Sequence, residues 1–136
     1  MLMPDDHPLL ALATFASTAL AMGNAMVVVP SLKHPLTATD LYQVLKTSDV
    51  PHDTFNIVTR DRAGVENELA KTLGEHDDVD SVWYAGSAEG QTAVQKASAG
   101  NMKRTSGRGV ASALPSVDEV LREATQVKNV WVPYGA

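Results

Sequence analysis

The chain of 136 residues contains no cysteine, few aromatic residues and more acidic than basic side chains. Without cysteine there is no disulfide, no thiolate metal site and no cysteine nucleophile. The formal net charge of -5 argues against nucleic acid and against an anionic membrane as partners, because both bind basic surfaces. The four histidines are far apart and never four positions from one another, so we expect no metal site.

The sequence also lacks a long hydrophobic run. The most apolar stretch, residues 8–23, is too short for a membrane span of about 20 residues and contains Thr14, Ser17 and Thr18. Acidic rather than basic residues precede it, which is the opposite of a signal peptide. We expect this stretch to be a buried helix and the protein to be cytoplasmic.

Short apolar runs that are typical of strands alternate with segments of helical periodicity. We expect strands at 25–29, 55–59, 80–84 and 129–132. We expect helices at 9–22, 37–47, 65–73 and 89–98 and from 116 to 124. Strands that alternate with helices need crossover connections, so the sequence predicts an α/β fold. The expected architecture is a Rossmann-like, doubly wound and mostly parallel sheet flanked by helices.

Several local features refine this expectation. Gly74 is expected to cap the helix before it, and Ser116 with Glu119 reads as a capping box. The Gly- and Ser-rich stretch 106–115 has no periodicity and is expected to be a loop. Two helices have a predicted buried stripe, formed by Ala38, Leu41, Tyr42 and Leu45 in one and by Val117, Val120, Leu121 and Ala124 in the other.

Two strand ends carry candidate cofactor-binding residues. In a doubly wound sheet, ligands bind beyond the carboxyl ends of the strands. Pro30 and Ser31 follow one predicted strand, and Gly86 and Ser87 follow another. A glycine there lets the backbone approach a phosphate, and the helix that begins near Glu89 directs its free N–H groups toward an anion. A tight turn from strand to helix explains the same residues equally well.

Four segments, in this order, resemble the aldehyde dehydrogenase superfamily. Residues 23–31 resemble the family pattern G-N-T-V-V-L-K-P-S-E, and residues 50–59 resemble G-[VF]-P…V-N-[IV]-V-T-G. Residues 76–89 resemble H-x-D-V-D-x-V-x-F-T-G-S-T-E, and residues 99–104 resemble A-x-x-N-L-K-R. The resemblance runs from about residue 4 to 106. It implies the cofactor-binding part of that superfamily, with NAD lying over the strand ends.

The departures from the family pattern fall on its functional positions. The two family residues that contact the adenosine ribose correspond to Val29 and Leu32, and Ala85 replaces the threonine of T-G-S. The oxyanion-donating asparagine corresponds to Asp6, whose carboxylate would repel an oxyanion. The general-base glutamate corresponds to Arg108, which is no base at neutral pH. The resemblance therefore implies no catalytic residue on this chain and no expected cofactor.

The tail carries a second resemblance. Residues 127–132 resemble the late family strand G-T-V-W-V-N, which in full enzymes returns to the cofactor sheet after the catalytic domain. In that interpretation the loop 107–115 stands where the full enzymes have their catalytic domain. Residues 1–136 then form a single truncated cofactor-binding domain. The chain then resembles the degenerate, cysteine-less C-terminal region of family 16 aldehyde dehydrogenases.

These observations favour a non-catalytic domain, a pseudoenzyme with a structural or interaction role. We expect it to pack on an aldehyde dehydrogenase catalytic domain, in the same chain or assembly, and to form homo-oligomers. The alternative is a retained NAD(P)-binding module centred on Gly86 and Ser87. A third interpretation, an oxidoreductase fragment that needs a supplied catalytic domain, is opposed by Arg108 and Asp6. Trp83 and Trp131 are expected in the core or at an interface.

The 11 lysines and arginines are scattered along the sequence, with one small cluster. Lys103, Arg104 and Arg108 could form an anion-binding patch. Such residues more often are solvated or pair with the acidic side chains, of which this chain has 16.

Overall fold

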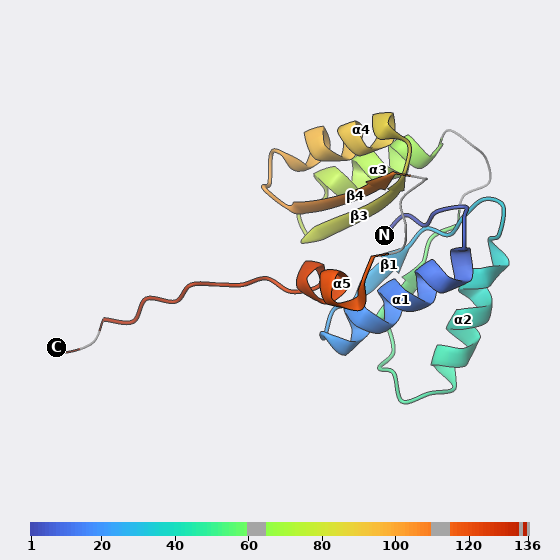
Figure 1. The fold of residues 1–136 in the computed structure, drawn as a ribbon, viewed down its shortest axis with the longest axis horizontal. Helices are drawn as coiled ribbons and strands as arrows, with labels where there is room; N and C mark the ends of the chain where they lie inside the picture. The colour runs from blue at the N-terminus through green and yellow to red at the C-terminus, as the bar shows by residue number, and fades with distance from the viewer. Residues whose placement is uncertain (60–64, 110–114, 134, 136) are drawn as a thin grey trace.

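The computed structural model describes residues 1–59, 65–109, 115–133 and 135. Helices and strands alternate along these residues (Figure 1). Their order is α1 (Pro8–Ala21), β1 (Met26–Val28), α2 (Leu36–Lys46), β2 (Phe55–Ile57), α3 (Val65–Glu75), β3 (Ser81–Gly86), α4 (Ala88–Ser98), β4 (Arg104–Gly109) and α5 (Val117–Glu123). The alternation confirms the predicted α/β class.

The first residues of the chain join two pairs of parallel strands. β1 pairs with β2, and β3 pairs with β4. Leu2 lies between the pairs and forms parallel bridges to Val29 and to Tyr84. Its N–H donates to the Trp83 carbonyl at 2.8 Å, and its carbonyl accepts from the Ala85 N–H at 3.1 Å. The strand order is therefore β2, β1, residues 1–3, β3, β4, all parallel.

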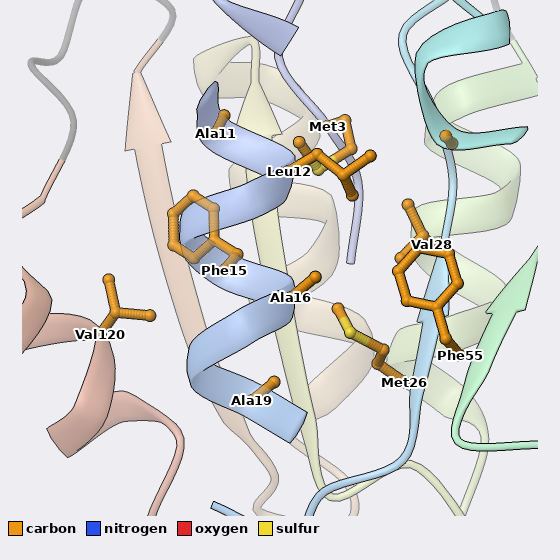
Figure 2. Close-up of a cluster of buried hydrophobic side chains, with 11 residues drawn as sticks. Met3, Ala11, Leu12, Phe15, Ala16, Ala19, Met26, Val28, Phe55 and Val120 are labelled. Atoms are coloured by element: carbon orange, nitrogen blue, oxygen red, sulfur yellow. The ribbon is translucent and has the colours of Figure 1, made fainter. Parts of the chain in front are cut away.

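Helices cover both faces of this sheet (Figure 1). One core cluster lies between the sheet and α1, α2 and α5, and Figure 2 shows it with Val120 of α5 on one side of α1 and Phe55 on the other. The second cluster joins Leu2, Val29, Val82 and Tyr84 of the sheet to Ala70 of α3 and Val94 of α4. This two-sided packing confirms the doubly wound architecture. No described helix is long and apolar enough to cross a membrane.

The ends of the helices follow from local sequence. Pro8 begins α1, where its missing N–H costs no hydrogen bond. Gly23, with a φ of 78°, ends the turn that follows this helix. The Asn24 side chain donates to the carbonyls of Ala19 and Ala124, at 3.1 and 2.9 Å, and so ties α1 to the end of α5.

The predicted capping box at the start of α5 is confirmed. The Ser116 hydroxyl accepts from the Glu119 N–H at 3.3 Å, and a Glu119 carboxylate oxygen accepts from the Ser116 N–H at 3.0 Å. The helix buries Val120 and Ala124, but Val117 is exposed, so its apolar face is narrower than expected.

Two expectations about helices are wrong. Gly74 does not cap α3 but lies inside it, where a Cβ atom would come within 2.8 Å of Ala97 Cβ in α4. The glycine is needed for close approach of two helices. Tyr42 of α2 is exposed rather than buried, although its ring stacks on Phe55 at 6.5 Å between centroids. Because α2 covers the edge strand β2, only a narrow part of its surface, centred on Ala38, is buried.

The expected loop 106–115 is wrong in its first part, because residues 104–109 form β4. Ser106 and Gly107 have no strand periodicity, but pairing with β3 satisfies their backbone. A Cβ on Gly107 would lie 2.1 Å from Gln91 Cδ, so the α4 side chain fills the place of the missing one. Residues 110–114 lie outside the described residues.

The predicted strand 129–132 is also wrong. These residues have no regular structure and extend away from the body of the molecule (Figure 1). The side chains of Val130, Trp131 and Val132 are 79%, 93% and 77% exposed. An apolar run forms a strand only where a neighbouring strand is available, and no strand within the described residues pairs with this run. Trp83, by contrast, packs on Phe15 at 5.3 Å between ring centroids, as expected of a core residue.

Candidate functional site

The four candidate residues lie at one edge of the sheet. Pro30 and Ser31 follow β1, while Gly86 ends β3 and Ser87 is the N-cap of α4. Because Leu2 pairs with both strands, the carboxyl ends of β1 and β3 flank the chain segment that follows Met3. β2 lies on one side of this segment and β4 on the other, so the strand order reverses here. The four residues thus lie at the switch point where doubly wound sheets bind ligands.

The Gly86–Ser87 turn is open to solvent at the start of α4. The Ser87 side chain is exposed and its oxygen accepts from the Gly90 N–H at 3.1 Å. The remaining N–H groups of the first turn have no partner within the helix. Glu89 already supplies a negative charge to this turn, which suits the helix dipole but opposes a second anion.

Packing explains the small residue that follows this turn. A Cβ on Gly90 would lie 1.9 Å from the hydroxyl oxygen of Tyr84 and 2.9 Å from Asn67 Oδ1. Tyr84 is buried in β3, so its ring fixes the distance between β3 and the start of α4. The glycine therefore serves the contact between strand and helix, a role that the sequence alone did not reveal.

The end of β1 is closed by a polar cluster of Asp5, Ser31 and Lys33. Ser31 is only 1% exposed, and its hydroxyl donates to Asp5 Oδ1 at 2.5 Å while accepting from the Lys33 N–H at 3.2 Å. Lys33 Nζ lies 3.3 Å from Asp5 Oδ2. Both hydrogen-bonding directions of the hydroxyl are therefore in use within the protein. Sequence reasoning missed Asp5 and Lys33, because only the fold brings residue 5 beside residue 31.

Two further positions that the family resemblance singled out, Val29 and Arg108, lie at β1 and β4. Val29 is buried beside Leu2 in the cluster under α3 and α4, so an apolar side chain fills this place. Arg108 lies in β4 opposite Ala85 of β3, close to the carboxyl end of the sheet. Among the described residues, no three histidine or acidic side chains are grouped so that they could hold a metal ion.

Two of the three clustered cations bind carbonyl groups of the protein. Lys103 Nζ donates to the Leu73 carbonyl at 3.1 Å and to the carbonyl of His76, at the end of α3. Burial lowers the pKa of Lys103, while Asp77 and Asp80 act in the opposite direction. The Arg104 guanidinium donates to the Thr125 carbonyl just beyond α5. Both cations thus satisfy helix-end carbonyls, where positive charge is favourable.

The fold and the switch point define a parallel, doubly wound domain of the dinucleotide-binding type. The sequence pattern of the aldehyde dehydrogenase family matches residues 1–111. The chain therefore belongs to the aldehyde dehydrogenase family.

Curated relatives agree with this assignment but are much longer. The NADP/NAD-dependent aldehyde dehydrogenase PuuC of Escherichia coli is 34% identical over 104 residues, which are 76% of this chain and 20% of that protein. The mitochondrial aldehyde dehydrogenase of Leishmania tarentolae is 34% identical over 134 residues, 96% of this chain and 26% of that protein. Omega-crystallin of Nototodarus sloanii is 31% identical over 107 residues, 78% of this chain and 21% of that protein. The chain thus spans about a fifth to a quarter of these relatives.

Proposed function

We propose that this chain is a non-catalytic aldehyde-dehydrogenase-like domain with a structural or interaction role in a larger aldehyde dehydrogenase polypeptide or assembly. The observation that carries the proposal is the cluster of Asp5, Ser31 and Lys33. It closes the end of β1 with internal hydrogen bonds, at the edge where a dinucleotide would lie. A site that is satisfied from within offers a ligand little hydrogen-bonding gain.

The residues present fit a dinucleotide poorly. The exposed Ser87 and the start of α4 could offer N–H groups to a diphosphate. The carboxylate of Glu89 belongs to the same turn and would repel the diphosphate, while Asp5 is already bound by Lys33 and Ser31. The buried Val29 offers no hydrogen bond to a ribose. We therefore expect no cofactor to bind.

The residues at the same edge of the sheet also argue against catalysis. Arg108 stands near the carboxyl end of β4 in place of the family's general base, and it remains protonated at neutral pH. Asp6 replaces an oxyanion donor by an acceptor, and the chain has no cysteine nucleophile. Neither a base nor an oxyanion donor would be restored by supplying a catalytic domain.

The exposed apolar side chains support an interaction role. Leu9 and Leu10 in the first turn of α1, and Leu36 at the start of α2, are more than half exposed. Both helices begin on the side of the sheet where the strands end. Exposed apolar surface of this kind marks contact with another protein surface. We propose an aldehyde dehydrogenase catalytic domain as the partner, within a cytoplasmic protein related to the degenerate region of family 16.

The second candidate function is a retained NAD(P)-binding module, which the open Gly86–Ser87 turn favours. Calorimetric titration with NAD and NADH separates the two. We expect no saturable heat at millimolar cofactor. Binding tighter than roughly 100 μM, or about −5.5 kcal/mol, that Gly86→Trp abolishes would instead establish the module. Met102→Trp, at a residue that is 90% exposed, is the matched control for an added indole.

A further inference from the structure

Carbonyl oxygens gather where α3 ends and β4 begins, at the opposite edge of the sheet from the candidate site. α3 and α4 lie side by side over β3 and β4 (Figure 1). The Leu73 carbonyl, in the last turn of α3, accepts from Lys103 Nζ at 3.1 Å, and the carbonyl of His76, just beyond the helix, accepts from the same atom. Carbonyl groups at a helix end lack donors within the helix and carry partial negative charge, so they attract a cation.

The Asn101 side chain supplies a third oxygen to the same place. In the orientation that satisfies both ends of its amide, Nδ2 donates to the Ser98 carbonyl at 2.9 Å and Oδ1 accepts from Lys103 Nζ at 3.3 Å. The three oxygens match the three N–H groups of an ammonium. The nearby carboxylates of Asp77 and Asp80 add negative charge, which favours a cation further.

The ammonium of Lys103 connects three elements at this point. Lys103 directly precedes β4, and Arg104, the first residue of that strand, donates its N–H to the Asp80 carbonyl at 3.3 Å. From there the lysine side chain reaches the end of α3, while Asn101 is held at the end of α4. β4 has the sequence Arg-Thr-Ser-Gly-Arg-Gly, which has little intrinsic preference for a strand. A cation seated among the three oxygens therefore helps to fix where this strand begins.

We propose that the oxygens of Leu73, His76 and Asn101 form a monovalent-cation site. The Lys103 ammonium occupies this site in the intact chain, and a free ammonium ion fills it when the lysine side chain is shortened. The acceptors are carbonyl and amide oxygens, which replace the hydration shell of a monovalent cation without a full opposite charge. This inference goes beyond the proposed function and is independent of whether the carboxyl edge binds a dinucleotide.

Two variants of the same residue test the proposal by chemical rescue. Lys103→Ala removes the ammonium and leaves its place open, whereas Lys103→Met removes the ammonium but keeps an apolar side chain in that place. We expect both variants to unfold at a lower urea midpoint than the wild-type chain. Ammonium chloride should restore at least half of the loss in Lys103→Ala, because a cation that binds only the folded state stabilises it. The reference is tetramethylammonium chloride at the same concentration, whose cation has no N–H group and is too bulky for the site.

The comparison among the three chains decides the outcome. Ammonium should leave the midpoints of Lys103→Met and of the wild-type chain where tetramethylammonium leaves them, since neither offers an open site. A rise that is equal in all three chains would be a bulk salt effect and would overturn the proposal. It is overturned as well if Lys103→Ala loses no stability, or if ammonium recovers none of the loss.

Nuclear magnetic resonance gives a direct readout in the variant and in the wild-type chain. The Val79 N–H donates to the His76 carbonyl at 3.2 Å, so its signal reports on that oxygen. In Lys103→Ala this signal should shift with ammonium and reach a plateau, and a linear drift without a plateau would refute binding.

The wild-type chain provides a test that needs no folded variant. An ammonium with all three N–H groups bonded exchanges its hydrogens slowly with water. The side-chain NH₃⁺ signal of Lys103 should therefore persist at a pH and temperature where that of the exposed Lys96 is lost. Equal exchange at Lys103 and Lys96 would show that the ammonium is not held by the three oxygens and would contradict the proposal.

Discussion

The hydroxyl of Ser31 donates a hydrogen bond of 2.5 Å to the carboxylate of Asp5. The bond connects the turn after β1 to the segment that leaves the centre of the sheet. It thereby fixes the two chain segments that would have to make room for a ligand at this edge.

Loss of this bond should lower stability. In Ser31→Ala the Asp5 carboxylate loses a buried donor, so we expect the free energy of unfolding to fall by about 1–2 kcal/mol in urea denaturation. Lys33→Met removes only the partner of an ion pair whose lysine is 69% exposed, and the loss should stay below about 1 kcal/mol. Equal losses in the two variants would show that the hydroxyl contributes no more than the ion pair.

The contact between Tyr84 and Gly90 predicts a steric effect. Gly90→Ala places a methyl group 1.9 Å from the Tyr84 hydroxyl oxygen, so we expect destabilisation by about 1–3 kcal/mol or more. Thermal unfolding measures it, and Gly100→Ala is the control, because no atom lies within 4 Å of the added methyl there.

Coupling between the same two residues makes this prediction specific. Tyr84→Phe removes the nearest atom that the new methyl would meet but leaves the ring carbon Cζ at 2.5 Å, so it should recover only part of the stability lost in Gly90→Ala. Additive effects in the double-mutant cycle would mean that the glycine serves the helix rather than its contact with the ring.

The buried N-terminal amine predicts a dependence of stability on pH. Burial lowers the pKa of the Met1 amine from 8.0 to about 5, and the amine donates to the Val27 carbonyl at 2.6 Å. The folded chain therefore disfavours the protonated form. The stability that the neutral, buried amine contributes is complete above pH 8. It is lost as pH falls from 8 toward 5, and it changes no further below that range. The slope approaches about 1.4 kcal/mol per pH unit.

Urea denaturation between pH 5 and 8.5 measures this effect against an N-terminally acetylated chain. Acetylation removes the titrating group. A cavity of about 280 Å³ that Met1 lines offers space for the acetyl group. We expect the stability difference between the two chains to change across this interval. A constant difference would contradict the lowered pKa.

Much of the fold could be predicted because local signals and packing agree. The helix from Pro8, the capping box at Ser116 and the apolar run of β1 each have one favourable structure, and the fold adopts it. β4 could not be predicted, because Gly107 belongs in a strand only once Gln91 covers it. Conversely, the run around Trp131 has the composition of a strand, but its side chains are exposed and none of the described strands pairs with it.

The candidate site, too, could be predicted only in part from the sequence. Gly86 and Ser87 were recognisable as a turn between strand and helix, and the structure brings that turn to the predicted edge. The bond between Asp5 and Ser31 depends on two segments that are distant in sequence, so no local pattern reports it. The role of Gly90 depends on the orientation of the Tyr84 ring, which is decided by packing.

The position of Leu2 has a consequence for how the domain assembles. β1 and β2 with α1 and α2 form one half, and β3 and β4 with α3 and α4 form the other, each built from neighbouring segments of chain. Leu2 links the two pairs of strands, yet most of the sequence lies between Leu2 and Tyr84. Contacts between distant segments form late, because a large loop must close first. We therefore expect the two half-domains to fold separately. The start of the chain should pair with both of them last.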